Sequence, residues 1–174
     1  YGVIYAGAQK NIGPAGLTIV IVCEDLLGGA LPYTPDVFNY AVQGKSDSMY
    51  NTPPTYAWYI AGLVFDWIEA SGGVERMAQL NQHKADTLYR YLDQSAFYVN
   101  DIPVEFRSHM NIPFQITDET LHGRFVSEAE AAGLSSLKGH RSVGGMRASI
   151  YNAVPEAAVD ALIAYMDEFA AEHA

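Results

Sequence analysis

The sequence predicts two structural parts of different class: the end of an α/β layer over residues 1–54 and an α+β unit over residues 55–174. Two near-continuous apolar runs close to the start are typical of strands that are covered on both faces. Two long helical patterns then precede alternating strand patterns, an order expected of an α+β unit. With 174 residues, 49% of them hydrophobic, the chain is long enough to bury a core.

The opening strands are expected at residues 2–6 and 17–22, and the loop between them holds one lysine, Lys10. Gly13 and Gly16 shape the turn. A lysine held at the end of a strand, away from free solvent, has a lowered pKa, and its neutral amine can attack a carbonyl to form a Schiff base. Alternatively, Lys10 is an ordinary surface lysine in a hairpin loop, and the local pattern leaves both readings open.

Residues 24–54 are expected to be mostly irregular, because four prolines lie between residues 31 and 54. One short helix is expected to begin near Glu24, and another over residues 36–42. Residues 48–55 combine hydroxyl and amide side chains in front of a longer helix. Such groups either cap the helix or present its N–H groups to an anion such as phosphate, and the local pattern favours capping.

Two long helices are predicted next, from residue 56 to a stop at 71–73 and over about residues 74–92. The first is apolar on most sides, so we expect it to be buried or to lie at a subunit interface. The second has one apolar side and one side that we expect to be solvated, with Glu75, Arg76, Lys84, Asp86 and Arg90 on it. His83 on that polar side is read as a surface residue.

The rest of the chain predicts a small, largely antiparallel sheet with helices on one face. Alternation over residues 110–116 and 146–151 indicates two strands, and Pro113 favours a sheet edge for the first. The other predicted elements are extended pieces at 98–99 and 104–106, a helix from a cap at Asp118 to about 132, a strand at 134–137 and a helix over about 155–171.

Composition argues against several classes of protein, among them nucleic-acid-binding and membrane-spanning proteins. Ten basic and twenty acidic residues give a net charge of -10, which argues against nucleic-acid binding. The single cysteine, Cys23, cannot form an internal disulfide and favours a reducing, cytoplasmic location. No run is long enough for a membrane span, and no Cys/His spacing indicates a metal site. Because the chain opens inside an apolar strand without an initiator methionine, we expect it to be part of a longer protein.

A basic cluster stands out against this acidic background. Residues 138–147 contain a lysine, a histidine and two arginines. Arginine forks match carboxylate and phosphate, so a local anion site is one reading, and a solvated basic loop is the other.

Three motifs, taken in order, resemble the phosphoserine aminotransferase family, a class-V branch of the fold-type I pyridoxal-phosphate enzymes. They are residues 8–16 (AQKNIGPAG), residues 50–55 (YNTPPT) and residues 138–152, which begin KGHR and end GGMRASIYN. The resemblance covers the whole chain and implies that it is the C-terminal half of such an enzyme. Residues 1–54 would then end the large cofactor-binding α/β domain and form a linker loop, and residues 55–174 would form linking helices and the small α+β domain.

The resemblance also implies roles for residues around the cofactor. Lys10 would form the Schiff base with pyridoxal 5'-phosphate, and Gln9 would contact the cofactor phosphate. Asn51 and Thr52 would bind the phosphate of the cofactor held by the other subunit. The active site would therefore be shared across a homodimer.

For the substrates, the resemblance implies that Arg147 clamps the α-carboxylate and that His140 and Arg141 hold the distal phosphate or carboxylate. The complete enzyme would transfer the amino group between glutamate and 3-phosphohydroxypyruvate to give O-phosphoserine, in serine and pyridoxine biosynthesis. Its partners would be small anionic amino and oxo acids, with no nucleic acid and no membrane.

The family's aspartate on the pyridine nitrogen, its ring-stacking aromatic residue and its early phosphate-binding loop lie upstream of Lys10, outside this chain. We therefore expect little transaminase activity from the chain alone. Two alternatives remain: another class-V aminotransferase acting on small amino acids, against which His140 and Arg141 argue, and an inactive fragment that serves only as a folded or dimerisation domain.

Overall fold

A computed structural model describes residues 1–173, and the chain divides into two compact units, Tyr1–Ser71 and a second that begins at Gly72. Each unit is described by itself. The sequence predicts a domain boundary between residues 54 and 55, whereas the compact units meet one helix later. Where the domains of the complete protein divide stays a prediction.

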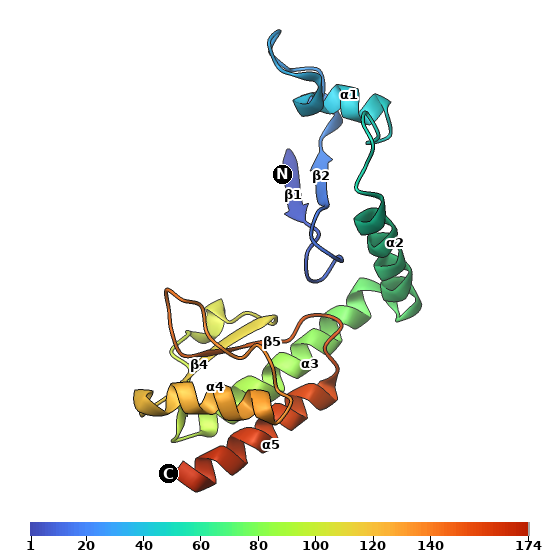
Figure 1. The fold of residues 1–174 in the computed structure, drawn as a ribbon. Helices are drawn as coiled ribbons and strands as arrows, with labels where there is room; N and C mark the ends of the chain where they lie inside the picture. Colours follow the sequence, from blue (N-terminus) through green and yellow to red (C-terminus); the bar gives the residue numbers. More distant parts are fainter. Residues whose placement is uncertain (174) are drawn as a thin grey trace. The chain divides into compact units, whose positions relative to one another are not determined.

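The first unit opens with a β-hairpin (Figure 1). Strands β1 (Val3–Gly7) and β2 (Thr18–Val22) pair antiparallel, from Val3 opposite Val22 to Gly7 opposite Thr18. Both predicted strands are confirmed, but the expected cover on both faces is wrong for the described chain. Every residue of β1 is exposed, and the Tyr5 side chain has 77% of its surface in contact with solvent. No described element packs over both faces of this hairpin.

Short helices occupy the connection after the hairpin. A single turn, η1 (Glu24–Leu26), follows β2 and confirms the helix expected at Glu24. The helix expected over residues 36–42 is divided into η2 (Asp36–Phe38) and α1 (Tyr40–Lys45). The division falls at Asn39, whose side-chain oxygen accepts a hydrogen bond from Ala41 N and so starts a new helix.

Helix α2 (Thr55–Ala70) ends the first unit and confirms the first long predicted helix. Only its small residues Ala57 and Ala61 are buried, while Tyr59 is 66% exposed. The expectation that α2 is buried on most sides is therefore wrong within the described chain. The other expectation, that this helix lies at a subunit interface, stays a prediction.

The second unit begins with α3 (Gly73–Gln94), as predicted. His83, Glu75, Arg76, Asp86 and Arg90 are exposed as expected, but Lys84 is buried with 2% of its surface exposed. The prediction of a solvated Lys84 is wrong because its ammonium group is satisfied inside the unit. Its Nζ donates to the carbonyl oxygens of Ile150, Tyr151 and Val154 at 3.2, 2.8 and 2.8 Å.

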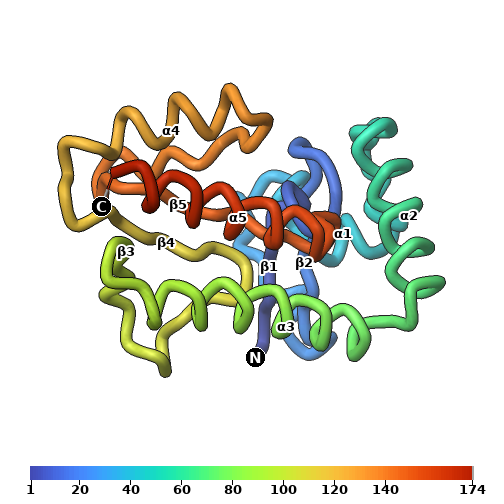
Figure 2. The backbone as a smooth tube through the Cα atoms, turned by 90° about the horizontal axis from the view of Figure 1, so that it is seen from below, coloured from blue at the N-terminus to red at the C-terminus, as the bar shows by residue number. Residues whose placement is uncertain are grey.

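A three-stranded antiparallel sheet lies at the centre of this unit, in the order β3 (Tyr98–Val99), β4 (Asn111–Ile116) and β5 (Met146–Ser149). Helices α4 (His122–Ala131) and α5 (Glu156–His173) join α3 on one face, and Figure 2 shows α5 running between the other two. The core between sheet and helices includes Leu88, Tyr98, Ile112, Phe114, Phe125, Met146, Met166 and Phe169. The predicted α+β unit with helices on one face is confirmed for this part.

Two short extended pieces are not strands. Residues 104–106 form a 3-10 turn, η3 (Val104–Phe106), because Pro103 precedes them and its carbonyl accepts from Phe106 N at 2.9 Å. Residues 134–137 form no strand; only Lys138 makes an isolated bridge, to Met146. A second 3-10 turn, η4 (Glu119–Leu121), follows the predicted cap at Asp118 and leads into α4.

Pro113 lies in the central strand, so its predicted edge position is wrong. It stands opposite Arg147 in β5. Arg147 N turns away from β4 and donates to Leu137 O at 2.7 Å, so Pro113 N faces the β3 side. Strand β3 pairs only with Gln115 and Ile116, and the missing N–H of Pro113 therefore falls beyond the end of that ladder. The Asn100 side chain donates to Pro113 O there.

Candidate functional site

Lys10 lies in the loop that joins β1 to β2, in a left-handed backbone conformation with φ of 78°. Non-glycine residues rarely adopt this region, and such strain is concentrated at functional sites. The residue just before the loop is anchored: Ala8 is fully buried and its N–H donates to Leu17 O at 2.8 Å. Gln9 forms a bridge with Gly13. The loop thus presents Lys10 from a fixed base.

The side chains of Gln9 and Lys10 are both exposed in the first unit. The expectation that Lys10 is held away from solvent is therefore wrong for the described chain. The hairpin that carries this loop is itself open, since every residue of β1 is exposed.

The loop contacts α2 at Gly13 and Gly16. A Cβ atom at Gly13 would stand 3.5 Å from Ala61 Cα, and one at Gly16 would stand 4.0 Å from Ala57 Cβ. These contacts account for the burial of Ala57 and Ala61 on an otherwise exposed helix. Gly16 also has a φ of 105°, which only glycine adopts readily. The position of Lys10 is consequently tied to α2 by close backbone approach.

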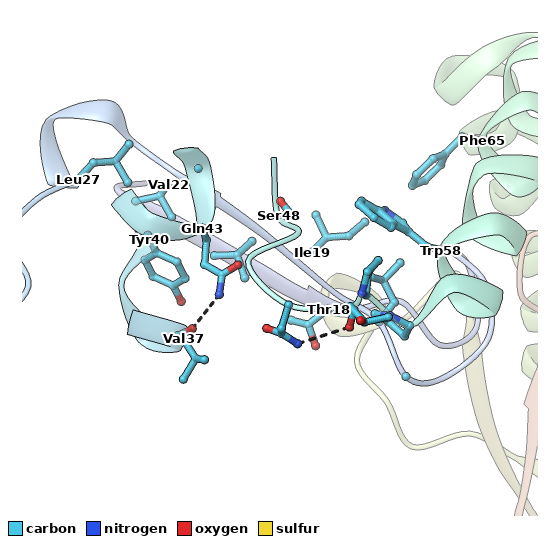
Figure 3. Close-up of a pocket in the computed structure, with 18 residues that line it drawn as sticks. Thr18, Ile19, Val22, Leu27, Val37, Tyr40, Gln43, Ser48, Trp58 and Phe65 are labelled. Atoms are coloured by element: carbon cyan, nitrogen blue, oxygen red, sulfur yellow. Dashed lines mark hydrogen bonds between the residues drawn. The ribbon is translucent and has the colours of Figure 1, made fainter. Parts of the chain in front are cut away.

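Asn51 and Thr52 lie in front of α2 and line a cavity of about 660 Å³ in the first unit (Figure 3). Other walls come from β2, including Thr18 and Ile19, and from Trp58 of α2. Asn51 Nδ2 donates to Thr52 O at 3.4 Å, a long contact. Asn51 and Thr52 thus open onto a cavity that neither Lys10 nor Gln9 lines.

The capping interpretation of residues 48–55 is wrong. Pro54 occupies the cap position of α2, and no side chain there accepts a hydrogen bond from the first turn. Since the first N–H groups of a helix have no partner inside it, the start of α2 keeps donors beside Asn51 and Thr52.

The basic cluster lies in the second unit, in the turn that leads into β5. Gly139 N donates to Gly145 O at 2.9 Å, and Gly144 N donates to His140 O at 2.8 Å. A Cβ atom at Gly139 would stand 2.0 Å from Gly144 O, so only glycine fits there. The side chains of His140 and Arg141 project from this tight turn and are exposed. His140 Nδ1 lies 2.7 Å from Ser142 Oγ.

Arg147 is the second residue of β5, directly after this turn. Its side chain lies on the face of β5 away from the core and is half-buried. Its Nε is buried without a hydrogen-bond partner. Arg147 forms no ion pair with any carboxylate of residues 1–173. A buried guanidinium nitrogen that lacks a partner is suited to an anion that the protein itself does not supply.

The structure thus brings Gln9 and Lys10 together in one loop, Asn51 and Thr52 together beside one cavity, and His140, Arg141 and Arg147 together at one end of β5. The first two groups belong to the first unit and the third to the second.

Sequence reasoning predicts Ser149 and Tyr151 on the strand face of Arg147 but does not single out Asn111 as a neighbour. Asn111 on β4 accepts hydrogen bonds from Ser149 Oγ at 3.1 Å and from the Tyr151 hydroxyl at 3.0 Å. The strand alternation was a usable signal, since it places all three with Arg147 on the face opposite the core.

Among residues 1–173 no three histidine, cysteine, aspartate or glutamate side chains gather closely enough to hold a metal ion. No helix in this part of the chain is long and apolar enough to cross a membrane. Cys23, the single cysteine of the chain, is exposed.

Comparison with known proteins yields a consistent set of relatives. The sequence profile of the family Aminotransferase class-V matches residues 1–162. A protein of Hahella chejuensis (strain KCTC 2396) named phosphoserine aminotransferase is 60% identical over 174 residues, which are 100% of this chain and 48% of that protein. One of Azotobacter vinelandii with the same name is 59% identical, over 99% of this chain and 48% of its own length. The chain spans about half the length of the curated relatives it matches.

Solved structures agree with the sequence relatives. The phosphoserine aminotransferase from Bacillus circulans subsp. alkalophilus superposes with a TM-score of 0.96 at 46% identity, over 100% of this chain and 48% of that one. The pyridoxal-phosphate-bound phosphoserine aminotransferase from Trichomonas vaginalis gives a TM-score of 0.89 at 44% identity, over 95% and 48%. These likenesses confirm the fold class that the sequence predicts.

Proposed function

The chain belongs to the class-V aminotransferase family, and on that premise we propose that the complete protein is a pyridoxal-phosphate-dependent phosphoserine aminotransferase. It transfers the amino group between glutamate and 3-phosphohydroxypyruvate to give O-phosphoserine. The observation that carries this proposal is the 60% identity to a relative of that name over all 174 residues. The strained backbone at Lys10 supports it from the structure.

The residues present fit this cofactor. Lys10 offers a primary amine on a loop anchored by Ala8, which suits an aldehyde carbon. Asn51 and Thr52 offer amide and hydroxyl donors next to uncapped helix N–H groups, which suit a phosphate. Bound pyridoxal phosphate supplies an electron sink for the bonds at the substrate α-carbon.

Lys10 is the catalytic residue of the proposal. Its amine would hold the cofactor. Once freed by the substrate amine, Lys10 Nζ would accept the α-proton as general base and deliver it to the cofactor carbon as general acid. Gln9, exposed beside it, binds the cofactor phosphate from the same loop. The loop packs against Ala57 and Ala61 of α2, and this contact positions the amine.

We infer that the complete protein is a homodimer in which Asn51 and Thr52 bind the cofactor phosphate of the other subunit. Two features support this. Both residues open onto a cavity that Lys10 does not line, and α2 exposes Tyr59 and other aromatic side chains that a partner would cover. Light scattering of the complete protein tests the dimer, and a monomeric mass would contradict it.

Substrate binding falls to the basic groups of the second unit. Arg147 binds the α-carboxylate, because its buried Nε lacks a protein partner and no described carboxylate pairs with it. His140 and Arg141 bind the distal phosphate or carboxylate from their exposed positions in the tight turn. Both substrates carry anions at two ends, which accounts for this concentration of cations in a chain of net charge -10.

We propose that the complete protein lies in the cytoplasm, a reducing compartment, which agrees with a single cysteine that cannot form a disulfide within the chain. Fractionation of cells that express a tagged protein tests this, and recovery in an oxidising compartment would contradict it.

The test of the function is an amino-transfer assay on the complete protein. With pyridoxal phosphate, glutamate and 3-phosphohydroxypyruvate, we expect formation of 2-oxoglutarate and O-phosphoserine. Lys10→Ala should lose at least a thousandfold in kcat, since one residue serves as both attachment point and proton carrier. Lys45→Ala, which changes an exposed lysine of α1, is the matched control and should keep wild-type turnover. Equal turnover by the Lys10→Ala enzyme would refute the assignment.

A further inference from the structure

The sheet of the second unit has a polar face that nothing in that unit covers with a helix. Alternation along β4 and β5 puts Ile112, Phe114, Met146 and Ala148 in the core. The opposite face, which we call the polar face, carries Asn111, Pro113, Gln115, Arg147 and Ser149, continued by Tyr151 after β5, and all six are half-buried.

Asn111 is held rigidly on this face. Its Oδ1 accepts one hydrogen bond from Ser149 Oγ at 3.1 Å and a second from the Tyr151 hydroxyl at 3.0 Å. An amide oxygen has two lone pairs, so these two donors satisfy it and fix which way the amide points. The Nδ2 group is turned the other way, and no hydrogen bond from it reaches any residue described in this structure.

The strand register sets Asn111 beside Arg147. Asn111 stands opposite Ser149, and Pro113 stands opposite Arg147, so Asn111 and Arg147 are diagonal neighbours on one face. Such neighbours lie about 7–8 Å apart at the backbone, within reach of long side chains. The residue directly opposite Arg147 is a proline, whose side chain has neither charge nor hydrogen-bonding group.

A carboxylate held by an arginine fork still has lone pairs to fill. The fork occupies one lone pair on each oxygen, and the remaining ones accept hydrogen bonds from other donors. Next to Arg147, the amide of Asn111 is a donor with a fixed orientation and an unused N–H pair.

We propose that Asn111 is a second binding residue for the carboxylate that Arg147 holds, donating a hydrogen bond from Nδ2 to a carboxylate oxygen. Ser149 and Tyr151 are positioning residues that aim the amide. This inference rests on the proposed function, in which Arg147 binds the α-carboxylate of an amino acid.

The experiment measures binding of glutarate, a dicarboxylate without an amino or oxo group, to the complete protein loaded with pyridoxal phosphate. Isothermal titration calorimetry gives the dissociation constant for the wild type, Asn111→Ala, Asn111→Asp and Arg147→Lys. Gln79→Glu makes the same amide-to-acid change on the exposed side of α3 and is the matched control. Thermal unfolding of each variant shows whether it is folded.

We expect Asn111→Ala to bind glutarate about tenfold to a hundredfold more weakly than the wild type, the loss typical of a hydrogen bond to a charged group. Asn111→Asp keeps the shape and the acceptor for Ser149 and Tyr151 but turns the donor into an anion, so binding should fall further than with alanine. Gln79→Glu should bind like the wild type. In turnover, the KM for glutamate should rise in Asn111→Ala more than kcat falls.

Two results would overturn the proposal. If Asn111→Ala and Asn111→Asp both bind glutarate within twofold of the wild type while Arg147→Lys loses binding, Asn111 is not a ligand although the proposed function stands. If Asn111→Asp does not fold, Asn111→Ala alone decides on the same criterion. If the wild type neither binds glutarate nor transfers amino groups, the proposed function fails first and this inference fails with it.

Discussion

A buried ammonium group, that of Lys84, holds the turn between β5 and α5. Its Nζ donates to three carbonyl oxygens, those of Ile150, Tyr151 and Val154. Burial lowers the pKa of Lys84, and the charge of Glu156 acts in the opposite direction. One turn earlier on α3, Asn81 Nδ2 donates to Asn152 Oδ1 at 2.7 Å. Two polar side chains of α3 therefore fix the segment that follows Arg147.

Replacing Lys84 by methionine keeps the length of the side chain but leaves the three carbonyl groups without their donor. We expect the free energy of unfolding of the second unit to fall by about 1–3 kcal/mol, the usual cost of unsatisfied buried polar groups. Arg90→Met, on the exposed side of the same helix, should change it by less than about 0.5 kcal/mol.

Urea unfolding followed by far-UV circular dichroism measures this difference. Tryptophan fluorescence is an internal control, because both tryptophans of the chain, Trp58 and Trp67, lie on α2 in the first unit. A Lys84→Met chain as stable as wild type would contradict this account of the turn.

Tyr98 controls stability at high pH. It is 1% exposed, its hydroxyl donates to Met166 O at 2.8 Å, and burial raises its pKa, with Tyr91, Tyr165 and Asp167 adding to the effect. An unfolded tyrosine loses its proton near pH 10 while the folded Tyr98 keeps it. The unfolded state then binds fewer protons, so stability falls as pH rises above about 10.

Tyr98→Phe removes this difference in bound protons between the folded and unfolded states. Near neutral pH the variant should be less stable than wild type by about 1 kcal/mol, the worth of its hydrogen bond. Between pH 9 and 11 the wild type should lose about 1.4 kcal/mol more than the variant, since one tyrosine proton is released only on unfolding of the wild type. Urea midpoints at the two pH values test this, and parallel losses in the two proteins would contradict it.

At this scale the sequence predicts which residues carry the proposed chemistry but not all of their surroundings. Lys84 was assigned to the solvated side by its charge. Its spacing instead places it on the buried side of the helix. The buried residues of that side follow one helical stripe and include Met77, Asn81, Lys84, Ala85, Leu88 and Leu92. The sequence places Asn111 inside the strand predicted over residues 110–116 and indicates no further role for it. Its bond to Tyr151, forty residues later, depends on strand pairing that no local pattern specifies.

The hairpin loop and α2 work as one element. The loop that carries Lys10 rests on two alanines through Gly13 and Gly16, with Ala61 only 1% exposed. Contacts between the loop and α2 thereby stabilise the strained backbone conformation of Lys10.

Ala61→Leu should force the loop away from the helix. Overpacking a tight contact costs about 1–3 kcal/mol, so we expect the free energy of unfolding of the first unit, measured by tryptophan fluorescence in urea, to fall by that amount. In the complete protein the same change should weaken binding of pyridoxal phosphate, because Lys10 moves with its loop.

Gly62→Ala is the matched control, since a Cβ atom at Gly62 meets nothing within 4 Å. It should stabilise α2 by up to about 1 kcal/mol, because alanine is the better helix former. If Ala61→Leu is as stable as wild type and binds the cofactor equally well, the loop does not depend on α2.

Elements with strong periodicity were predicted well. The long helices α2, α3 and α5, the opening hairpin strands and β4 lie where the apolar patterns put them. The wrong predictions concern short extended segments and the burial of β1 and α2. Residues 104–106 formed a 3-10 turn after Pro103, and Pro113 was tolerated in a central strand because β3 is only two residues long. Single residues with β-forming side chains cannot outweigh such local geometry.

At the scale of the whole molecule, the described chain leaves apolar surface exposed. Strand β1 and the aromatic residues of α2 were expected to be covered, and in the described chain they are not. The chain spans 48% of the length of its relative from Hahella chejuensis. The predicted family and fold class are confirmed, whereas the roles of individual site residues remain proposals.

The chain of 174 residues by itself should transfer amino groups poorly or not at all. The resemblance places the groups that stack on the cofactor ring and pair with its nitrogen upstream of Lys10, and Lys10 is exposed here. Incubating the purified chain with pyridoxal phosphate, glutamate and 3-phosphohydroxypyruvate, beside the complete protein, tests this. Robust turnover by the chain alone would show that its own residues suffice.

The central claim is that Lys10 holds the cofactor, and borohydride reduction followed by peptide mapping tests it most directly. Reduction fixes pyridoxal phosphate permanently to whichever amine holds it. For the complete protein we predict one attached pyridoxyl group per chain, located by mass spectrometry on the peptide that contains Lys10, and none in Lys10→Ala. A label on another lysine, or a complete and folded protein that takes up no label, would contradict the account.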